Sequence, residues 1–212
     1  MQTPWSNLHT HYSKQDWINK PSIFAEFAMK YFPETGRVLD LGAGQGQDSK
    51  YFAENGYEVM CTDISAEALD LAKEKISESE AKTKVTFVQL DLNESIPYPN
   101  ESFDVVYAHL AIQFFSDVRT KEIAAEIYKI LKPGGVVALL CNSTSDPEYD
   151  QGEQIEADYF QIGDMKKRYY TPETLGRYFS EFEQIICDAE GETYKDAAKG
   201  VHNLIRFVGK KS

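Results

Sequence analysis

Residues 37–46 read Arg37-Val38-Leu39-Asp40-Leu41-Gly42-Ala43-Gly44-Gln45-Gly46, a short apolar run that leads into three alternating glycines. The apolar run predicts a buried strand. The glycines let the backbone turn sharply and bring its amide groups close to a ligand. A helical pattern follows from Asp48 to Glu54 and ends at Asn55-Gly56. The order strand, tight turn, helix indicates the start of an α/β fold.

The same alternation continues along the chain. Apolar runs predict further strands at residues 57–62, 85–90, 103–108 and 136–141, and two more near 183–188 and 203–208. Helices are expected at 21–32, after a cap at Ser65, before the Lys132-Pro133-Gly134-Gly135 turn, and from Thr171 onward. Continuous apolar strands joined by crossover helices imply an open parallel sheet with helices on both faces.

The length, net charge and cysteine positions of the chain argue against several classes of protein. The 212 residues suffice for one sizeable core, and the net charge of -12 would repel a nucleic-acid backbone, so no nucleic-acid partner is expected. Cys61, Cys141 and Cys187 lie in apolar runs without metal-ligand spacing, which predicts reduced core residues and no metal site. The first 20 residues are polar, and no apolar stretch is long enough for a membrane span. We expect a cytoplasmic protein.

Three of the predicted strands end in an aspartate, namely Asp40, Asp63 and Asp91. In doubly wound sheets ligands bind beyond the carboxyl ends of the strands, so these side chains are expected to share one cleft. A dinucleotide fingerprint would need a third glycine where Gln47 stands, counting from Gly42. An acidic strand end repels a pyrophosphate but attracts the ammonium and sulfonium groups of S-adenosylmethionine. The sequence therefore favours S-adenosylmethionine over NAD or a flavin nucleotide.

Each aspartate has an expected partner on that ligand. Asp63 is suitably placed to bind the two ribose hydroxyls, and Asp91 can accept from the adenine amino group. Leu92 would add an apolar contact and a backbone donor to the base. Together, residues 38–46, 62–65, 90–92 and 131–135 resemble the motifs of class I S-adenosylmethionine-dependent methyltransferases, in order, within residues 20–142.

The resemblance implies a three-layer, Rossmann-like fold with a seven-stranded, mostly parallel sheet whose last strand is antiparallel. It implies that Gly42 and Gly44 lie along the methionine part of the cofactor. We also expect Ala43 and Ile64 to bind the cofactor. Within the superfamily the chain looks like small bacterial methyltransferases with a plain methyltransferase domain, including the tellurite-resistance and thiol or halide types. Tyr107-Ala108-His109-Leu110 stands where methyltransferases of nucleic-acid bases carry Asn/Asp-Pro-Pro-Tyr, so base amino methylation is not supported.

Histidines and aromatic residues add further candidates. His109 follows the fourth strand and is a candidate general base or cofactor contact, whereas His202 opens the last strand and is either a second base in the same cleft or a surface histidine. The N-terminal arm carries Trp5, Tyr12 and Trp17. Their rings are expected either to meet the sulfonium by cation-π attraction or to anchor the arm on the core.

Residues 143–170 form a polar, irregular and aromatic-rich segment. Long insertions of this kind are often functional, so we expect a substrate lid inserted into a single methyltransferase domain, residues 1–212, that opens with an N-terminal arm and helix at 1–32. The expected reaction is in-line methyl transfer to a small-molecule acceptor, with S-adenosylhomocysteine as the other product. The alternative is a non-catalytic module that binds S-adenosylmethionine as a sensor or assists a partner enzyme.

Overall fold

The computed structural model describes residues 12, 15–194 and 201–212. The strands are β1 (Arg37–Leu41), β2 (Glu58–Asp63), β3 (Val85–Gln89), β4 (Phe103–His109), β5 (Leu131–Cys141), β6 (Glu153–Glu156), β7 (Tyr159–Ile162), β8 (Met165–Arg168), β9 (Glu183–Gly191) and β10 (Leu204–Lys210). The α-helices are α2 (Ile23–Ala28), α3 (Gln47–Glu54), α4 (Ala66–Ser77), α5 (Asp117–Ile130) and α6 (Pro172–Tyr178). Short 3-10 helices are η1 (Asp16–Asn19), η2 (Met29–Tyr31), η3 (Glu80–Lys84) and η4 (Ile112–Phe114).

The larger of two sheets has seven strands in the order β3-β2-β1-β4-β5-β10-β9. β1 pairs in parallel with β2 and β4, and β10 runs antiparallel to both of its neighbours. The predicted mostly parallel sheet with an antiparallel last strand is therefore confirmed. The strand order reverses between β1 and β4, and ligands of such sheets bind in the crevice at that point.

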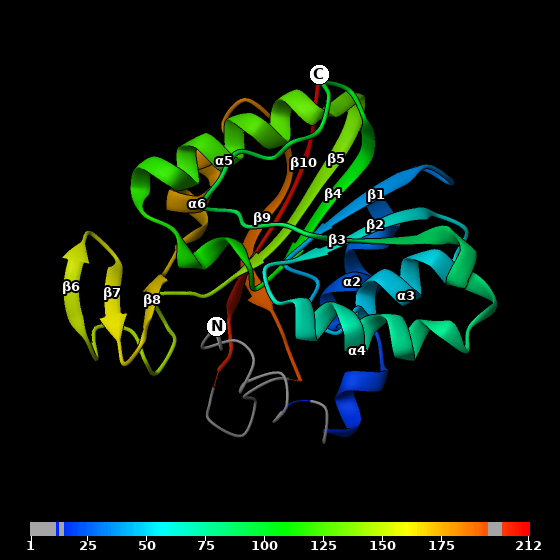
Figure 1. The fold of residues 1–212 in the computed structure, drawn as a ribbon. Helices are drawn as coiled ribbons and strands as arrows, with labels where there is room; N and C mark the ends of the chain where they lie inside the picture. Colours follow the sequence, from blue (N-terminus) through cyan, green and yellow to red (C-terminus); the bar gives the residue numbers. More distant parts are fainter. Residues whose placement is uncertain (1–11, 13–14, 195–200) are drawn as a thin grey trace.

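Helices cover both faces of this sheet (Figure 1). α2, α3 and α4 pack on one face around Phe24, Phe52 and Leu69, and α5 and α6 pack on the other. Neighbouring residues of β4 divide between the two cores, with Val105 in the first and Val106 in the second. Because a strand buried on both faces reads as a continuous apolar run, these strands were visible in the sequence.

Residues 153–168 form a second, three-stranded antiparallel sheet of β6, β7 and β8, which we call the inserted sheet. It lies beside the start of α5 in Figure 1. The expectation of an irregular segment was wrong here, because two-residue turns at 157–158 and 163–164 close hairpins. Asp158 (φ 56°) and Gly163 (φ 58°) adopt the left-handed conformation that short hairpin turns need. The Gly163-Asp164 pair is a hairpin signal that sequence reasoning missed.

One strand boundary also differs from the prediction, whereas a predicted cap is confirmed. β5 begins at Leu131 rather than at residue 136, since the Lys211 N–H donates to the Gly135 carbonyl and the Gly134 N–H donates to the Lys211 carbonyl, both at 2.8 Å. The residues predicted as a turn therefore belong to β5, where they pair with the segment that follows β10. Ser65 caps α4 as expected, with its side chain accepting from the Ala68 N–H.

Candidate functional site

A cavity of about 400 Å³ lies at the carboxyl ends of the central strands. Its volume is in the range of small-molecule sites. All residues predicted to bind the cofactor line it, namely Tyr12, Trp17, Asp40, Gly42, Ala43, Gly44, Asp63, Ile64, Asp91, Leu92 and His109. The fold thus brings together side chains from the N-terminal segment and from four successive strand ends.

The turn between β1 and α3 packs tightly against the segment after β4. Gly42 has a φ of 69°, and a Cβ atom at this position would lie 2.5 Å from the Cβ of Ala111. Only glycine fits this approach without moving the chain. The Ala43 N–H donates to the Thr62 carbonyl (2.8 Å), which joins the turn to β2.

Asp63, at the end of β2, holds the same turn from the other side. Its Oδ2 accepts the Gly44 N–H and its Oδ1 accepts the Ser65 N–H, both at 2.8 Å. An ionised carboxylate has about four lone-pair sites, so each oxygen keeps acceptor capacity for a ligand hydroxyl. The ribose contact expected of Asp63 stays a prediction, and the geometry leaves room for it.

Asp91 and Leu92 follow β3 and form the next part of the wall. Asp91 Oδ1 accepts the N–H and the side-chain amide of Asn93, both at 2.8 Å. Leu92 is buried, and its carbonyl accepts from Arg119 Nε (2.7 Å). The two residues present a carboxylate and an apolar side chain side by side, the combination predicted for an adenine ring.

Asp40, at the acidic end of β1, is 2% exposed. Ser49 Oγ donates to its Oδ2 at 2.6 Å. Burial raises the pKa of Asp40 well above its ordinary value, and the nearby charges of Asp48 and Asp63 raise it further. No basic side chain in the described part of the chain offsets this charge. Because a buried carboxylate without a cation is costly, the position suits a positively charged ligand group.

Sequence reasoning missed a further buried carboxylate of the cavity, Asp48 in the first turn of α3. Its Oδ1 accepts the Ser22 N–H (2.7 Å), and its Oδ2 accepts the hydroxyls of Ser22 and Tyr107, both at 2.8 Å. Ser22 also caps α2 by accepting from the Ala25 N–H. Ser22 and Asp48 line the cavity, so this network joins α2, α3 and β4 at its edge. In the sequence, Asp48 carried only the pattern of a helix start.

β4 reaches the cavity at His109, which is half-buried. The next residue, Leu110, has a φ of 54°, which is uncommon for leucine, and its N–H donates to the Leu140 carbonyl (2.8 Å). Backbone outliers of this kind cluster at functional sites. The catalytic role of His109 stays a prediction.

The N-terminal segment contributes aromatic rings to the cavity. The ring centroids of Tyr12 and Trp17 are 5.3 Å apart, and both residues line the cavity. Ile18 beside them is buried, and Lys75 of α4 donates to its carbonyl (2.8 Å). The segment is thus anchored on α4 while its aromatic residues line the cavity. Trp5 lies outside the described residues.

His202 fits the second of its two predicted placements, a histidine on the surface. It is exposed, it lies two residues before β10, and the described lining of the cavity does not include it. The structure does not bring this side chain to the cavity because β10 begins only at Leu204. The surface alternative fits its position, and we leave His202 out of the proposed site.

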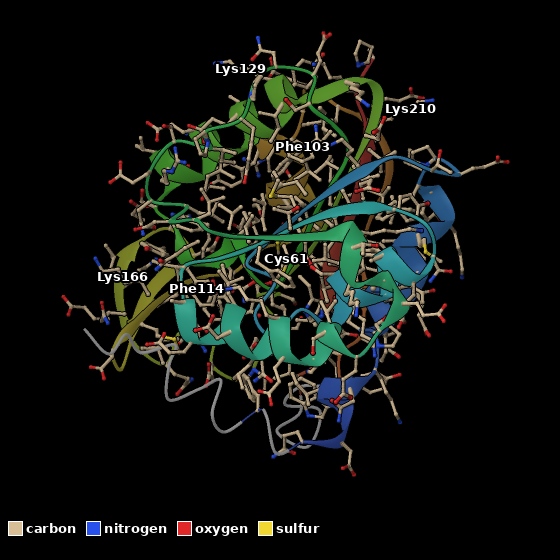
Figure 2. The ribbon with its side chains drawn as sticks, turned by 45° about the vertical axis from the view of Figure 1, so that its right-hand side comes forward. Cys61, Phe103, Phe114, Lys129, Lys166 and Lys210 are labelled. Carbon is tan, nitrogen blue, oxygen red and sulfur yellow. The ribbon has the colours of Figure 1, made fainter. Side chains whose placement is uncertain are left out.

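Another part of the lining comes from the end of η4, the residue after it and the inserted sheet. These lining residues are Phe114, Phe115, Gln161, Asp164, Met165 and Lys166. Figure 2 shows Lys166 and Phe114 at the same end of the molecule. Lys166 is the one lysine or arginine among the described lining residues.

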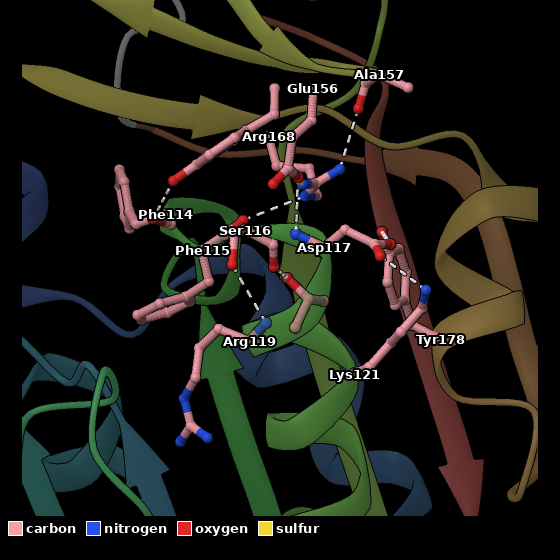
Figure 3. Close-up of polar contacts among 12 residues, drawn as sticks. Phe114, Phe115, Ser116, Asp117, Arg119, Lys121, Glu156, Ala157, Arg168 and Tyr178 are labelled. Carbon is pink, nitrogen blue, oxygen red and sulfur yellow. Dashed lines mark hydrogen bonds and ion pairs between the residues drawn. The ribbon is translucent and has the colours of Figure 1, made fainter.

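A cross-strand row fixes the inserted sheet to the start of α5 (Figure 3). Glu156 of β6 pairs with Tyr159 of β7, which pairs with Arg168 of β8. The Arg168 guanidinium lies 4.8 Å from the Tyr159 ring centroid and forms an ion pair with Glu156. Arg168 is 4% exposed, so this charge pair is shielded from water on the Arg168 side.

The same row holds the aromatic part of the wall. Arg168 Nε donates to the Phe115 carbonyl (3.2 Å), and the Tyr159 hydroxyl donates to the Phe114 carbonyl (3.1 Å). The Asp117 N–H, at the first residue of α5, donates to Glu156 Oε2 (2.8 Å). The row therefore positions the backbone of residues 114–117.

Among the residues that the structure describes, no group of three or more His, Cys, Asp or Glu is arranged to hold a metal ion. No helix in these residues is long and apolar enough to cross a membrane.

The fold and the glycine turn have counterparts among known proteins. A family model described as a methyltransferase domain matches residues 38–135, the span that carries the turn, Asp63 and Asp91. An S-adenosylmethionine-dependent methyltransferase from Methanosarcina mazei superposes with a TM-score of 0.73 at 21% identity, covering 87% of this chain and 96% of that one. Residues 38–135 are thus similar to a methyltransferase domain, and the fold of the chain is that of the Methanosarcina mazei protein.

The relatives of this chain differ in the acceptors that their names state. A malonyl-[acyl-carrier protein] O-methyltransferase from Enterobacter lignolyticus is 34% identical over 128 residues, 60% of this chain and 47% of the relative. A tRNA 5-carboxymethoxyuridine methyltransferase from Escherichia coli is 26% identical over 152 residues, 72% of this chain and 56% of the relative. The chain spans about half the length of these relatives. Because one of them carries tRNA in its name, the expectation of no nucleic-acid partner is left without support.

Proposed function

We propose that this protein transfers the methyl group of S-adenosylmethionine to a small-molecule acceptor and leaves S-adenosylhomocysteine. The observation that carries the proposal is the meeting of the glycine turn with Asp40, Asp63 and Asp91 on one cavity. Asp40, a buried carboxylate that no basic side chain among the described residues offsets, suits a ligand that brings an ammonium and a sulfonium. The names of the relatives support methyl transfer in general and leave the acceptor open.

In this proposal each part of the ligand has its own residues. Asp40 and the turn at 42–44 hold the methionine part, Asp63 accepts from the ribose hydroxyls, and Asp91 with Leu92 holds adenine. The bound ligand supplies a methyl group that its sulfonium charge already activates. The protein contributes positioning and exclusion of water around the methyl group. For an acceptor that must lose a proton, His109 is the proposed base.

Calorimetry on ligand-free protein tests the binding half of the proposal. Wild type should bind S-adenosylmethionine and S-adenosylhomocysteine but not NAD. Asp63→Ala should weaken binding by about 10- to 150-fold, since a hydrogen bond to a charged group contributes about 1.5–3 kcal/mol. Asp70→Ala is the matched control, because Asp70 is an exposed aspartate of α4. Binding of NAD in place of S-adenosylmethionine, or equal affinities in both variants, would contradict the assignment.

Transfer itself is tested with methyl-labelled S-adenosylmethionine and a metabolite extract. Label should move from the donor into acceptor molecules when the protein is added. Binding without any transfer of label would favour the alternative of a non-catalytic sensor.

A further inference from the structure

β7, β8 and the turn between them contribute residues to the lining of the cavity. Tyr159 pairs with Arg168, and Gln161 pairs with Lys166. Side chains two positions apart on a strand share a face, and directly opposed residues of an antiparallel pair do so as well. The face that carries Arg168 onto the start of α5 therefore carries Gln161 and Lys166 to the cavity, which both of them line.

Lys167, the next residue, lies on the opposite face. It pairs with Phe160, whose ring packs against Tyr149, and it forms an ion pair with Glu148. Two adjacent lysines thus have different surroundings, because side chains alternate along a strand. Lys166 lines the cavity and Lys167 does not.

The charged residues of the cavity come from different parts of its lining. Asp40, Asp63 and Asp91 lie at the strand ends, whereas Asp164 and Lys166 belong to one hairpin of the inserted sheet, in the part of the lining that also holds Phe114 and Phe115. Both hairpin residues are exposed, so water and salt screen their charges alike until a ligand covers them. A ligand group that contacts the wall of Lys166 and the two phenylalanines is most strongly attracted if it is an anion on an apolar body.

We propose that the methyl acceptor is a carboxylate, held by Lys166 against the aromatic wall of Phe114 and Phe115, and that the product is its methyl ester. This inference rests on the function proposed above. A carboxylate oxygen forms the new bond to the methyl carbon while the carbon–sulfur bond breaks and its electron pair passes to sulfur. The carboxylate loses its negative charge and the sulfonium its positive charge, so no proton is removed. Carboxylic acids are already ionised at neutral pH, and this acceptor needs no base.

The chemical class of the product is measured without knowing the acceptor. Wild-type protein is incubated with methyl-labelled S-adenosylmethionine and either a metabolite extract or a panel of malonyl-coenzyme A, phenylacetate, phenethylamine and 2-phenylethanol. Mild base then releases volatile labelled methanol from methyl esters, but not from methylated amines, ethers or thioethers. We expect base-labile label from the extract or from the acids of the panel. Label that is entirely base-stable would overturn the inference and leave the proposed methyl transfer intact.

The two lysines provide matched variants. Lys166→Gln should lower the initial rate of ester formation at subsaturating acceptor by at least about tenfold, the loss expected for one charge-assisted hydrogen bond. Its affinity for S-adenosylmethionine should match wild type, and Lys166→Arg should restore most of the rate. Lys167→Gln makes the same charge change on the other face, away from the cavity, and should leave the rate within about twofold, because its ion-pair partner Glu148 is about half exposed. Equal losses in Lys166→Gln and Lys167→Gln would overturn the role of Lys166.

Failure of the two proposals is distinguishable. If wild type does not bind S-adenosylmethionine or transfers no label, the proposed function fails and the acceptor inference falls with it. If wild type binds and transfers label to base-stable products, only the acceptor inference fails.

Discussion

Replacing Gly42 by alanine tests whether the turn after β1 owes its shape to the close approach of Ala111. Gly42 has a φ of 69°, and its added Cβ would lie 2.5 Å from the Cβ of Ala111. A non-glycine residue in the left-handed region costs about 1–2 kcal/mol, and overpacking costs about 1–3 kcal/mol. Gly42→Ala should therefore lower the free energy of unfolding by about 2–5 kcal/mol. For a chain of 212 residues this corresponds to a fall in Tm of about 4–20 °C.

Two further variants separate the clash from the backbone strain. Gly163→Ala places alanine at a φ of 58°, and the added Cβ would have no neighbouring atom within 4 Å. This variant should therefore show the backbone strain alone, a loss of about 1–2 kcal/mol in the free energy of unfolding. Ala111→Gly, combined with Gly42→Ala, removes the facing methyl group. The double variant should regain the part of the free energy of unfolding that the clash removes, about 1–3 kcal/mol.

Urea unfolding of the single and double variants measures these differences, and calorimetry follows their affinity for S-adenosylmethionine. Affinity should fall in Gly42→Ala and return in part in the double variant, because the turn regains its path. The reasoning is refuted if Gly42→Ala is no more destabilising than Gly163→Ala, or if Ala111→Gly recovers nothing.

Two other predictions concern buried charges. The raised pKa of Asp40 means that its protonated form stabilises the native state below about pH 4, and that this stabilisation is lost as pH rises through the native pKa. Ligand-free Asp40→Asn should therefore unfold at a higher temperature than wild type at pH 8, with the difference shrinking toward pH 4; a difference independent of pH would argue against this. Arg168→Gln should lower the free energy of unfolding by about 3 kcal/mol. This is the low end of the loss for breaking a buried ion pair, because Glu156 keeps partial contact with water. Hydrogen exchange at the Asp117 amide should accelerate in that variant, and unchanged exchange would show that the row does not position residues 114–117.

Much of the cofactor half of the site was predictable because its determinants are local. A strand buried on both faces must be apolar at every position, so β1 and β4 stood out without any knowledge of their neighbours. The aspartates at the ends of β1 and β2 needed only the rule that parallel strands open onto one edge. For His202 the sequence left both placements open, because the start of β10 is a boundary, and strand boundaries depend on pairing that the linear pattern does not record.

The succession of strands and helices along the chain, the glycine turn and the sign of the charges beside it follow from the linear pattern, because burial and turn geometry act within a few residues. Tertiary structure alone decided three things. It joined Ser22 to Asp48 and Tyr107, which are far apart in the chain. It set Gly42 against Ala111. It also turned Lys166 toward the cavity and Lys167 away from it, since the register of a hairpin, with its period of two, sets the face of each side chain.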